Sequence, residues 1–275
     1  MERFQLKPTI FFGPDALAAL EGLAGRRVMV ITDSFLAQSG LLERVRARLR
    51  DCTVEVFDQV VPDPPLELVA QGARALAEFR PQAVVAFGGG SAIDAAKAIV
   101  FFAARERDMR DCKFIAIPTT SGTGSEVTCV AVVSDINHAK DGVLAGPSMA
   151  IVDPEMTLTC PPLNTVTSAL DAFAHAAEAF TAADVDPVSD QLALEAIRLI
   201  MANLDKVYHN GADIEARTRM SMAANMAGIA FSNTGVSFGH AAGHEFGTKF
   251  HIGHGLACCY SVPVTLKWNA INNTE

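Results

Sequence analysis

The chain has 275 residues, half of them hydrophobic, and a formal net charge of −9 from 22 Lys and Arg against 31 Asp and Glu. This composition predicts a well-packed globular protein of one large or two ordinary domains and excludes a disordered chain. An acidic chain without a basic run does not suit nucleic acid or an anionic membrane surface, and no apolar run reaches membrane-spanning length.

The first half of the chain alternates apolar strand patterns with helical patterns. Strands are predicted at 26–33, 53–60, 82–87 and 113–118, and helices at 39–50, 66–79 and 91–104. Continuous apolar strands separated by helices favour a parallel sheet that is covered on both faces. We therefore expect an α/β domain over residues 1–160.

After the pair Pro161 and Pro162, the patterns become helical, with few strand signals. Apolar residues at helical spacing predict helices at 167–180, 189–208 and 214–231. These patterns predict a domain boundary near residue 160 and an all-helical second domain over 161–275.

A glycine loop follows the strand that ends at Phe87. Gly88, Gly89 and Gly90 would let the backbone approach a ligand closely, and a helix beginning near Ser91, with Ser91 as its N-cap, would point free N–H groups at a pyrophosphate. The loop is not the GxGxxG fingerprint, because Ile93 stands where the third glycine would be. The alternative is a tight turn that needs glycine for steric reasons.

Two further features lie at the predicted carboxyl ends of strands, where ligands bind in open α/β sheets. Asp33 could accept hydrogen bonds from adenosine ribose hydroxyls and would repel a 2′-phosphate, which favours NAD over NADP. The loop 118–126, with Thr119 and Thr120, offers hydroxyls and backbone donors to a nicotinamide ribose or carboxamide. Helix capping by Asp33 and an ordinary polar loop are the alternatives.

The strongest chemical signal is a carboxylate and three imidazoles split across two segments. Asp171 and His175 lie four residues apart on a predicted helix, and His240 and His254 come from a second block that also contains His244. Such a set is a complete first ligand shell for a divalent transition metal. A solvated or core-satisfied pair is the alternative for Asp171 and His175 taken alone, but the two blocks together indicate a metalloenzyme.

These blocks resemble the iron-containing, group III alcohol dehydrogenases from end to end of the chain. The resemblance is carried by VVPDPP, FGGGSAIDAAKAI, IPTTSGTGSEVT, AIVDPE, LDAFAHAAEAF and FSNTGVSFGHAAGHEFGTKFHIGHG. Within this family, the sequence of the blocks most resembles the propanol and ethanol dehydrogenase branch that is associated with propanediol and ethanolamine use.

The resemblance implies a Rossmann-like, dinucleotide-binding α/β domain followed by an all-α metal-binding domain, an architecture like that of dehydroquinate synthase, with the active site in the cleft between them. Asp171, His175, His240 and His254 match the iron ligands, His244 lines the site and Phe231 lines the substrate pocket. The implied cofactor-binding residues are Asp33, Gly89, Gly90, Ser91, Asp94, Thr119, Thr120, Thr128 and Lys140.

The implied activity is NAD(H)-dependent interconversion of a short-chain primary alcohol and its aldehyde, a reaction of the EC 1.1.1 type. A bound cation lowers the pKa of the alcohol oxygen, and His244 is expected to relay the proton to solvent. Iron is expected from the resemblance alone, since Zn(II) would serve equally as a Lewis acid. A homodimer or higher homo-oligomer is expected from the same source.

Two departures from the family pattern stand out. Relatives continue beyond Glu275 with a long run of helices, so we expect the helical domain to be incomplete at its C-terminus. The stretch 138–155 is shorter than its counterpart, which blurs the match at Lys140, and Ala169 replaces the usual glycine before the ligand aspartate.

Three other functions stay open on the sequence. One is a polyol dehydrogenase or a cyclising synthase of the same superfamily, the second is a metal-dependent hydrolase without nucleotide, and the third is a non-catalytic fragment. The scattered cysteines, without a CxxC pair, are expected to be reduced thiols. Because the N-terminus has no signal-peptide layout, we expect a cytoplasmic protein, with association to a bacterial microcompartment as a further expectation.

Overall fold

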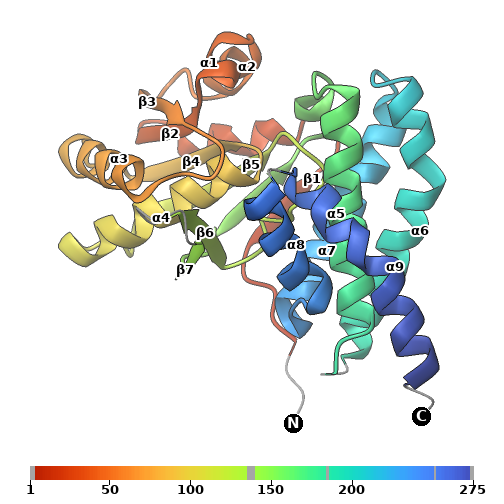
Figure 1. Cartoon of the computed structure of the whole chain (residues 1–275). Coiled ribbons are helices and arrows are strands. Elements are labelled where there is room, and N and C mark those ends of the chain that lie inside the picture. Colours follow the sequence, from red (N-terminus) through yellow and green to blue (C-terminus); the bar gives the residue numbers. More distant parts are fainter. Residues whose placement is uncertain (1–3, 135–139, 184–185, 251, 273–275) are drawn as a thin grey trace. The chain divides into compact units, whose positions relative to one another are not determined.

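The computed structural model describes residues 4–134, 140–183, 186–250 and 252–272, and Figure 1 shows their arrangement. The chain divides into two compact units. The first, here the α/β unit, consists of Lys7–Thr119 and Ser125–Met156. The second, here the helical unit, takes Thr120–Gly124, the chain from Thr157 onward and the segment before Lys7. The domain boundary expected near residue 160 stays a prediction, because contacts alone do not show which part folds independently.

The α/β unit contains a six-stranded parallel sheet in the order β1-β8-β5-β4-β2-β3. Its strands are β1 (Thr9–Phe12), β2 (Arg27–Asp33), β3 (Thr53–Val60), β4 (Ala83–Gly88), β5 (Lys113–Pro118) and β8 (Met149–Val152). The parallel sheet predicted from the apolar runs is therefore confirmed. The sequence did not predict β1, a four-residue edge strand that is mostly exposed and that exists only by pairing with β8, far along the chain.

Helices connect these strands, and a small hairpin is added. The helices are η1 (Ala16–Leu23), α1 (Ser34–Gln38), α2 (Leu41–Arg48), α3 (Leu66–Phe79), α4 (Gly90–Glu106) and η2 (Pro154–Thr157). The antiparallel hairpin pairs β6 (Val130–Ser134) with β7 (Lys140–Leu144). The sequence did not predict this hairpin, whose strands are short and pack against α4.

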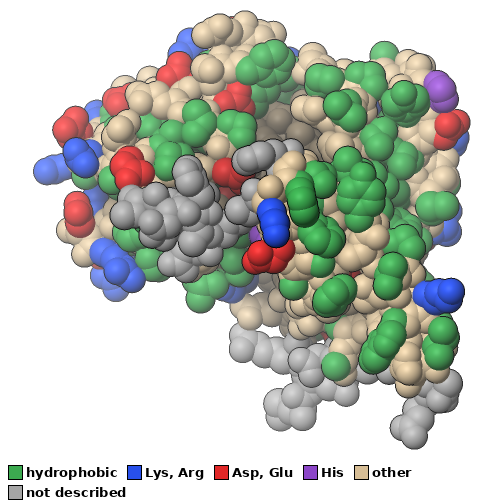
Figure 2. All heavy atoms as spheres, in the orientation of Figure 1, with side chains coloured by type: hydrophobic (Ala, Val, Ile, Leu, Met, Phe, Trp, Pro, Cys, Tyr) green, Lys and Arg blue, Asp and Glu red, His purple; other side chains and the backbone are tan. Residues whose placement is uncertain are grey.

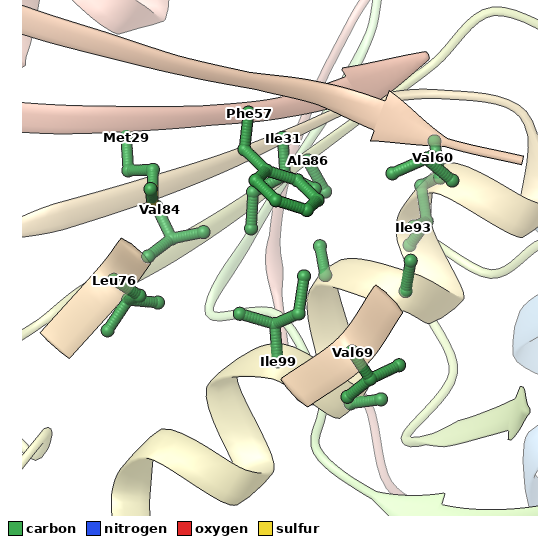
Figure 3. Close-up of a cluster of buried hydrophobic side chains, with 14 of the residues drawn as sticks. Met29, Ile31, Phe57, Val60, Val69, Leu76, Val84, Ala86, Ile93 and Ile99 are labelled. Carbon is green, nitrogen blue, oxygen red and sulfur yellow. The ribbon is translucent and has the colours of Figure 1, made fainter. Parts of the chain in front are cut away.

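The sheet buries both of its faces. On β2, Met29 and Ile31 point into one apolar cluster, whereas Val28 and Val30 point into another, as the two-residue period of a strand requires. Figure 3 shows the first cluster, in which side chains of α3 and α4, among them Ile99, meet the sheet. This double burial explains why the strands read as continuous apolar runs.

The helical unit consists of five long helices: α5 (Pro162–Phe180), α6 (Pro187–His209), α7 (Ile214–Thr234), α8 (Phe238–Phe250) and α9 (His254–Asn272). Helix α5 packs against α6, α7 and α9. The contact surfaces are rich in alanine, and Ala169, Ala172 and Ala176 of α5 are fully buried. Such small side chains let helix axes approach closely, which brings polar groups on α5 within reach of its neighbours.

One face of α9 is apolar and exposed. Tyr260, Val264, Trp268 and Ile271 recur at helical spacing and each is about 60% exposed. Figure 2 shows hydrophobic side chains gathered over this part of the helical unit. Exposed apolar stripes of this kind mark interaction surfaces. Across the described ranges, none of the helices combines the length and apolarity that a membrane span requires.

Candidate functional site

Helix α5 presents three ionisable side chains on one buried face. Asp171, His175 and Glu178 follow one another at intervals of four and three residues, so they lie one above the next along the helix. Their side chains are almost completely buried. Most of the other buried residues of α5 are alanines, so further polar partners for these side chains come from other helices.

Helices α8 and α9 bring the remaining histidines to Asp171. Nε2 of His240 lies 3.9 Å from Oδ1 of Asp171, and Nε2 of His254 lies 3.6 Å from the same oxygen. Nδ1 of His175 lies 4.0 Å from the other carboxylate oxygen, Oδ2. The imidazoles of His175 and His240 are stacked, with ring centroids 4.3 Å apart. The structure therefore gathers all four of the residues that were predicted to bind metal.

Three polar atoms in this cluster are buried and have no hydrogen-bond partner among the described residues. They are Oδ1 of Asp171, Nδ1 of His175 and Nε2 of His240. Burial raises the pKa of the Asp171 carboxyl, even though His254, His240 and His244 lower it. Burial also lowers the pKa of His175 well below its usual value, and His240 lowers it further. Buried nitrogen and oxygen atoms that lie close together without a hydrogen-bond partner fit a cation, which would compensate the cost of burying them.

Glu178 contacts the side chain and the backbone of His240. Its Oε2 lies 3.0 Å from Nδ1 of His240, and its Oε1 accepts the backbone N–H of His240 at 3.1 Å. Oε2 also accepts the backbone N–H of Ser237 at 2.6 Å. Burial raises the pKa of Glu178, but these hydrogen bonds outweigh it and hold the pKa below its usual value. Glu178 is thus a carboxylate that faces His240. The sequence analysis missed it, although its position seven residues after Asp171 on the same helix face was a usable signal.

A glycine allows α9 to approach α5 at the start of the helix. A β-carbon at Gly255 would overlap the carbonyl oxygen of Thr167 and lie 2.8 Å from Cβ of Asp171. Only glycine fits between His254 and the backbone of α5 without a shift of one helix. The residue after His254 is therefore small because of close packing, and not because a turn requires it.

Phe231 and His244 border the same cluster. Phe231, on α7, stacks on His175 with ring centroids 4.2 Å apart and planes inclined by 16°. The ring of His244, on α8, lies 4.9 Å from that of His254. Both residues therefore lie beside the proposed ligands, although whether they contact a substrate stays a prediction.

In the α/β unit, Asp33 and the glycine loop lie at the carboxyl ends of the neighbouring strands β2 and β4. Oδ1 of Asp33 accepts the backbone N–H of Leu36 at 2.8 Å and so caps α1. The prediction that Ser91 is the N-cap of the next helix is wrong, since α4 begins at Gly90 and Gly89 is its N-cap. The extended backbone of Gly89 turns the chain into the helix, and the N–H groups of the first turn then begin at Gly90.

A buried lysine was missed by the sequence analysis. Nζ of Lys97 donates to Oγ of Ser125 at 2.7 Å, to Oγ1 of Thr128 at 2.9 Å and to the carbonyl of Val130 at 2.8 Å. Burial lowers the pKa of Lys97, while Asp94 raises it. Only its place four residues after Ile93, on the helix face that meets the sheet, could have indicated it.

The same network includes two of the predicted cofactor-binding residues. Asp94 accepts the hydroxyl of Ser125 at 2.5 Å and the backbone N–H of Val132 at 3.0 Å, so both of its oxygens are engaged within the protein. Oγ1 of Thr128 accepts a hydrogen bond from Nζ of Lys97. Contacts of Asp94 and Thr128 with a cofactor stay predictions, and in the structure these residues join α4 to β6 and to the loop before it.

Thr119, Thr120 and Lys140, also predicted to bind the cofactor, lie in different parts of the chain. Thr119 directly follows β5 and donates its backbone N–H to the carbonyl of Gly88 at 3.0 Å, which places it beside the glycine loop. Thr120 belongs to the helical unit, with Thr120–Gly124. Lys140 begins β7, but its side chain lies outside what the structure describes.

Two family models match almost the whole chain. The model described as iron-containing alcohol dehydrogenase matches residues 7–154, and the model for the C-terminal domain of the same family matches residues 165–275. The chain belongs to the iron-containing alcohol dehydrogenase family. It is therefore an oxidoreductase for alcohol and aldehyde interconversion, as predicted, and not a hydrolase.

The relatives of this chain include a 1-propanol dehydrogenase, which agrees with the predicted branch. The chain is 38% identical to the 1-propanol dehydrogenase PduQ of Salmonella typhimurium, over 98% of this chain and 74% of the relative. It is 34% identical to the NAD-dependent methanol dehydrogenase of Bacillus methanolicus, over 100% and 78%. It is 37% identical to the NADPH-dependent butanol dehydrogenase of Clostridium saccharobutylicum, over 100% and 76%.

Solved structures of similar proteins share the fold. A 1,3-propanediol oxidoreductase superposes with a TM-score of 0.93 at 31% identity and covers 99% of this chain and 77% of its own. A sulfoacetaldehyde reductase from Bifidobacterium kashiwanohense, solved in complex with NAD+, superposes with a TM-score of 0.91 at 29% identity, over 98% and 77%. The predicted combination of a Rossmann-like domain with a helical domain is confirmed.

Proposed function

We propose that this protein interconverts a short-chain primary alcohol and its aldehyde with NAD(H). The observation that carries the proposal is the convergence of unpartnered buried donors on Asp171, within a chain of the iron-containing alcohol dehydrogenase family. The likeness to propanol, butanol and methanol dehydrogenases supports a small aliphatic substrate.

The proposed metal ligands are Asp171, His175, His240 and His254. A divalent cation held by them would act as a Lewis acid on the substrate oxygen. The family favours iron, and the donor set also suits Zn(II). Asp171 supplies the negative charge of the set, and its buried surroundings make that charge dependent on a cation. Burial keeps His175 neutral at physiological pH, as a ligand imidazole must be.

His244 is the proposed proton relay. It lies on α8 beside His254, is only partly buried, and can therefore connect the buried cluster with solvent. If His244 carries the substrate proton, an His244→Ala variant loses or shifts one limb of the pH–rate profile. A variant that keeps the profile of the parent enzyme excludes this role. Phe231 is the proposed apolar wall of the substrate pocket, because its ring covers His175.

The proposed NAD site uses the carboxyl ends of the strands. Backbone N–H groups at the start of α4, from Gly89, Gly90 and Ser91, would hold the pyrophosphate, because a helix N-terminus attracts anions. Asp33 would accept the ribose hydroxyls and disfavour a 2′-phosphate. Thr119 and Thr120 would bind near the nicotinamide, and Asp94, Thr128 and Lys140 complete the proposed set.

The cellular setting is part of the proposal. We infer a cytoplasmic enzyme that forms a homodimer or higher homo-oligomer, and the resemblance to the propanediol and ethanolamine branch favours association with a bacterial microcompartment. Size-exclusion chromatography with light scattering tests the oligomeric state directly.

One experiment tests the function. The protein is loaded anaerobically with Fe(II), and NADH consumption is measured with a panel of short-chain aldehydes and, in the reverse direction, with primary alcohols and glycerol. We expect turnover with propanal and its neighbours that a chelator abolishes and Fe(II) restores. Turnover of glycerol in preference to primary alcohols would instead favour a polyol dehydrogenase, and metal-loaded protein without turnover on the panel would contradict the proposal.

A further inference from the structure

A group of side chains in the described part of the chain that could hold a metal ion contains a cysteine. Asp171, His240, His254 and Cys258 each offer one donor atom, and these four atoms all lie within 4.8 Å of one another. Three of the four belong to the proposed ligand set. The fourth, Cys258, is a residue that the sequence analysis treated only as a reduced thiol.

Helix α9 positions the thiol beside His254. The two residues are four positions apart, so their side chains lie on one face of the helix. Sγ of Cys258 lies 3.7 Å from both ring nitrogens of His254. Donor atoms that bind one ion with bonds of about 2.0–2.3 Å lie about 3.3–3.6 Å apart when they meet near the tetrahedral angle. The spacing of Sγ from His254, and of His254 from Asp171, is already close to those values.

The packing around Cys258 keeps the thiol inside the cluster. Its side chain is fully buried. Helix α8 passes over it at Gly243, where a β-carbon would lie 2.5 Å from Sγ and 2.9 Å from Cα of Cys258. A larger residue at 243 would displace the thiol or separate α8 from α9, so the glycine preserves the position of Sγ beside the donors.

The two carboxylate oxygens of Asp171 face different groups. Oδ1 faces His240 and His254, the two residues that share the tight group with Cys258. His175 approaches Oδ2 instead and is stacked between Phe231 and His240. On the Oδ1 side, the thiol is therefore the donor that completes a group of four.

We propose that Cys258 supplies a sulfur ligand to the cation of the proposed function, in addition to Asp171, His175, His240 and His254. The inference deepens the proposed function and rests on its metal site. Cys258 would bind as a thiolate, with its proton released to solvent when the metal enters. Because sulfur donors favour Zn(II) and Co(II) over Fe(II), this chain would hold those ions more firmly than a site of three imidazoles and a carboxylate alone.

Cobalt absorption tests the ligand directly. A thiolate bound to Co(II) gives an intense near-ultraviolet charge-transfer band that nitrogen and oxygen donors do not give. The purified protein is stripped with a chelator, loaded with one equivalent of Co(II) and compared with Cys258→Ser and Cys259→Ser variants. We expect the band in the parent protein and in Cys259→Ser, and its loss in Cys258→Ser. Zn(II) affinity, measured by chelator competition, should fall roughly tenfold or more in Cys258→Ser only.

The outcome separates this inference from the proposed function. A Co(II)-loaded parent protein without the band overturns sulfur ligation, whatever its activity, and so does a band that persists in Cys258→Ser. The proposed function is tested independently by turnover of the Fe(II)-loaded parent protein on the aldehyde panel. Circular dichroism of the stripped proteins shows whether Cys258→Ser is folded, and Cys258→Ala provides a second variant with the same expected loss of the band.

Discussion

Glu178 and His240 form a buried carboxylate–imidazole pair, with Oε2 of the glutamate 3.0 Å from Nδ1 of the histidine. When Nδ1 carries the proton and donates it to Glu178, Nε2 is left as the acceptor that faces Asp171. The same carboxylate accepts the backbone N–H of His240, which fixes the start of α8 as well as the ring. Carboxylates that orient a ligand histidine in this way increase its basicity and its affinity for metal.

The Glu178→Gln variant tests this orienting role. It keeps the volume of the side chain but removes its charge, and one end of the amide can no longer accept a hydrogen bond. We expect the affinity for Zn(II) to fall by about 10–100-fold, measured by competition with a chelator. Glu195→Gln is the control, because the side chain of Glu195 is partly exposed on α6 and pairs with Arg198 of the same helix. Equal metal affinity in Glu178→Gln and the parent protein would show that the pair is only structural.

The glycines on either side of His254 form a matched pair of substitutions. Gly255→Ala places a methyl group against Thr167 and Asp171, so we expect a loss of about 1–3 kcal/mol in the free energy of unfolding and weaker metal binding. Gly253 has open space where a β-carbon would be, so Gly253→Ala should cost at most about 1 kcal/mol, through the helix N-cap. Thermal melts with and without Zn(II) give both quantities. If both variants bind metal like the parent protein, close approach at Gly255 does not control the site.

The buried His175 predicts how the stability of the metal-free protein depends on pH. Burial holds the pKa of His175 well below its unfolded value of 6.5, so the unfolded chain binds more protons between the two values. The free energy of unfolding therefore falls as pH drops from about 7 to about 5, by at most about 1.4 kcal/mol per pH unit from this group.

Urea unfolding in the presence of a chelator measures this slope. We expect a shallower dependence in His175→Gln, which cannot take up the proton. His209→Gln should follow the parent protein, since His209 is exposed at the end of α6. The difference between the parent protein and His175→Gln isolates this residue from Asp171, whose raised pKa acts with the opposite sign. Identical slopes in those two proteins would rule out a neutral, buried His175.

The charge of Asp33 is expected to set the preference for NAD over NADP. The relatives differ in this preference, since one is named as NAD-dependent and another as NADPH-dependent. Asp33→Asn removes the charge but keeps the side-chain oxygen that accepts the backbone N–H of Leu36. We expect kcat/KM for NADP+ to rise by about tenfold relative to NAD+, because the repulsion between two like unit charges about 4 Å apart is worth about 1–4 kcal/mol. The thermal midpoint should stay unchanged, since the helix cap is retained. A cofactor preference equal to that of the parent enzyme would remove Asp33 from the NAD site.

Much of the fold could be predicted from local patterns. The apolar runs around Val30, Val85 and Ile115 correspond to the buried central strands, because a strand covered on both faces has no polar side to interrupt the run. Asp171 and His175 could be placed on one helix face by their spacing alone. The family could be recognised from short blocks that are spread along the whole chain.

The sequence by itself indicated the strands β2 to β5, the helices α3 to α7 and the clustered histidines. Only the tertiary structure decided that Glu178 faces His240, that Lys97 is buried in a network of hydroxyls, and that Cys258 stands among the metal-binding donors. The contacts of Glu178 and Cys258 depend on how closely α5, α8 and α9 pack, and those of Lys97 depend on how α4 packs against β6 and the loop before it. Periodicity along one helix reports which face is buried, but the partner across that face is fixed by the packing of helices that are distant in the chain.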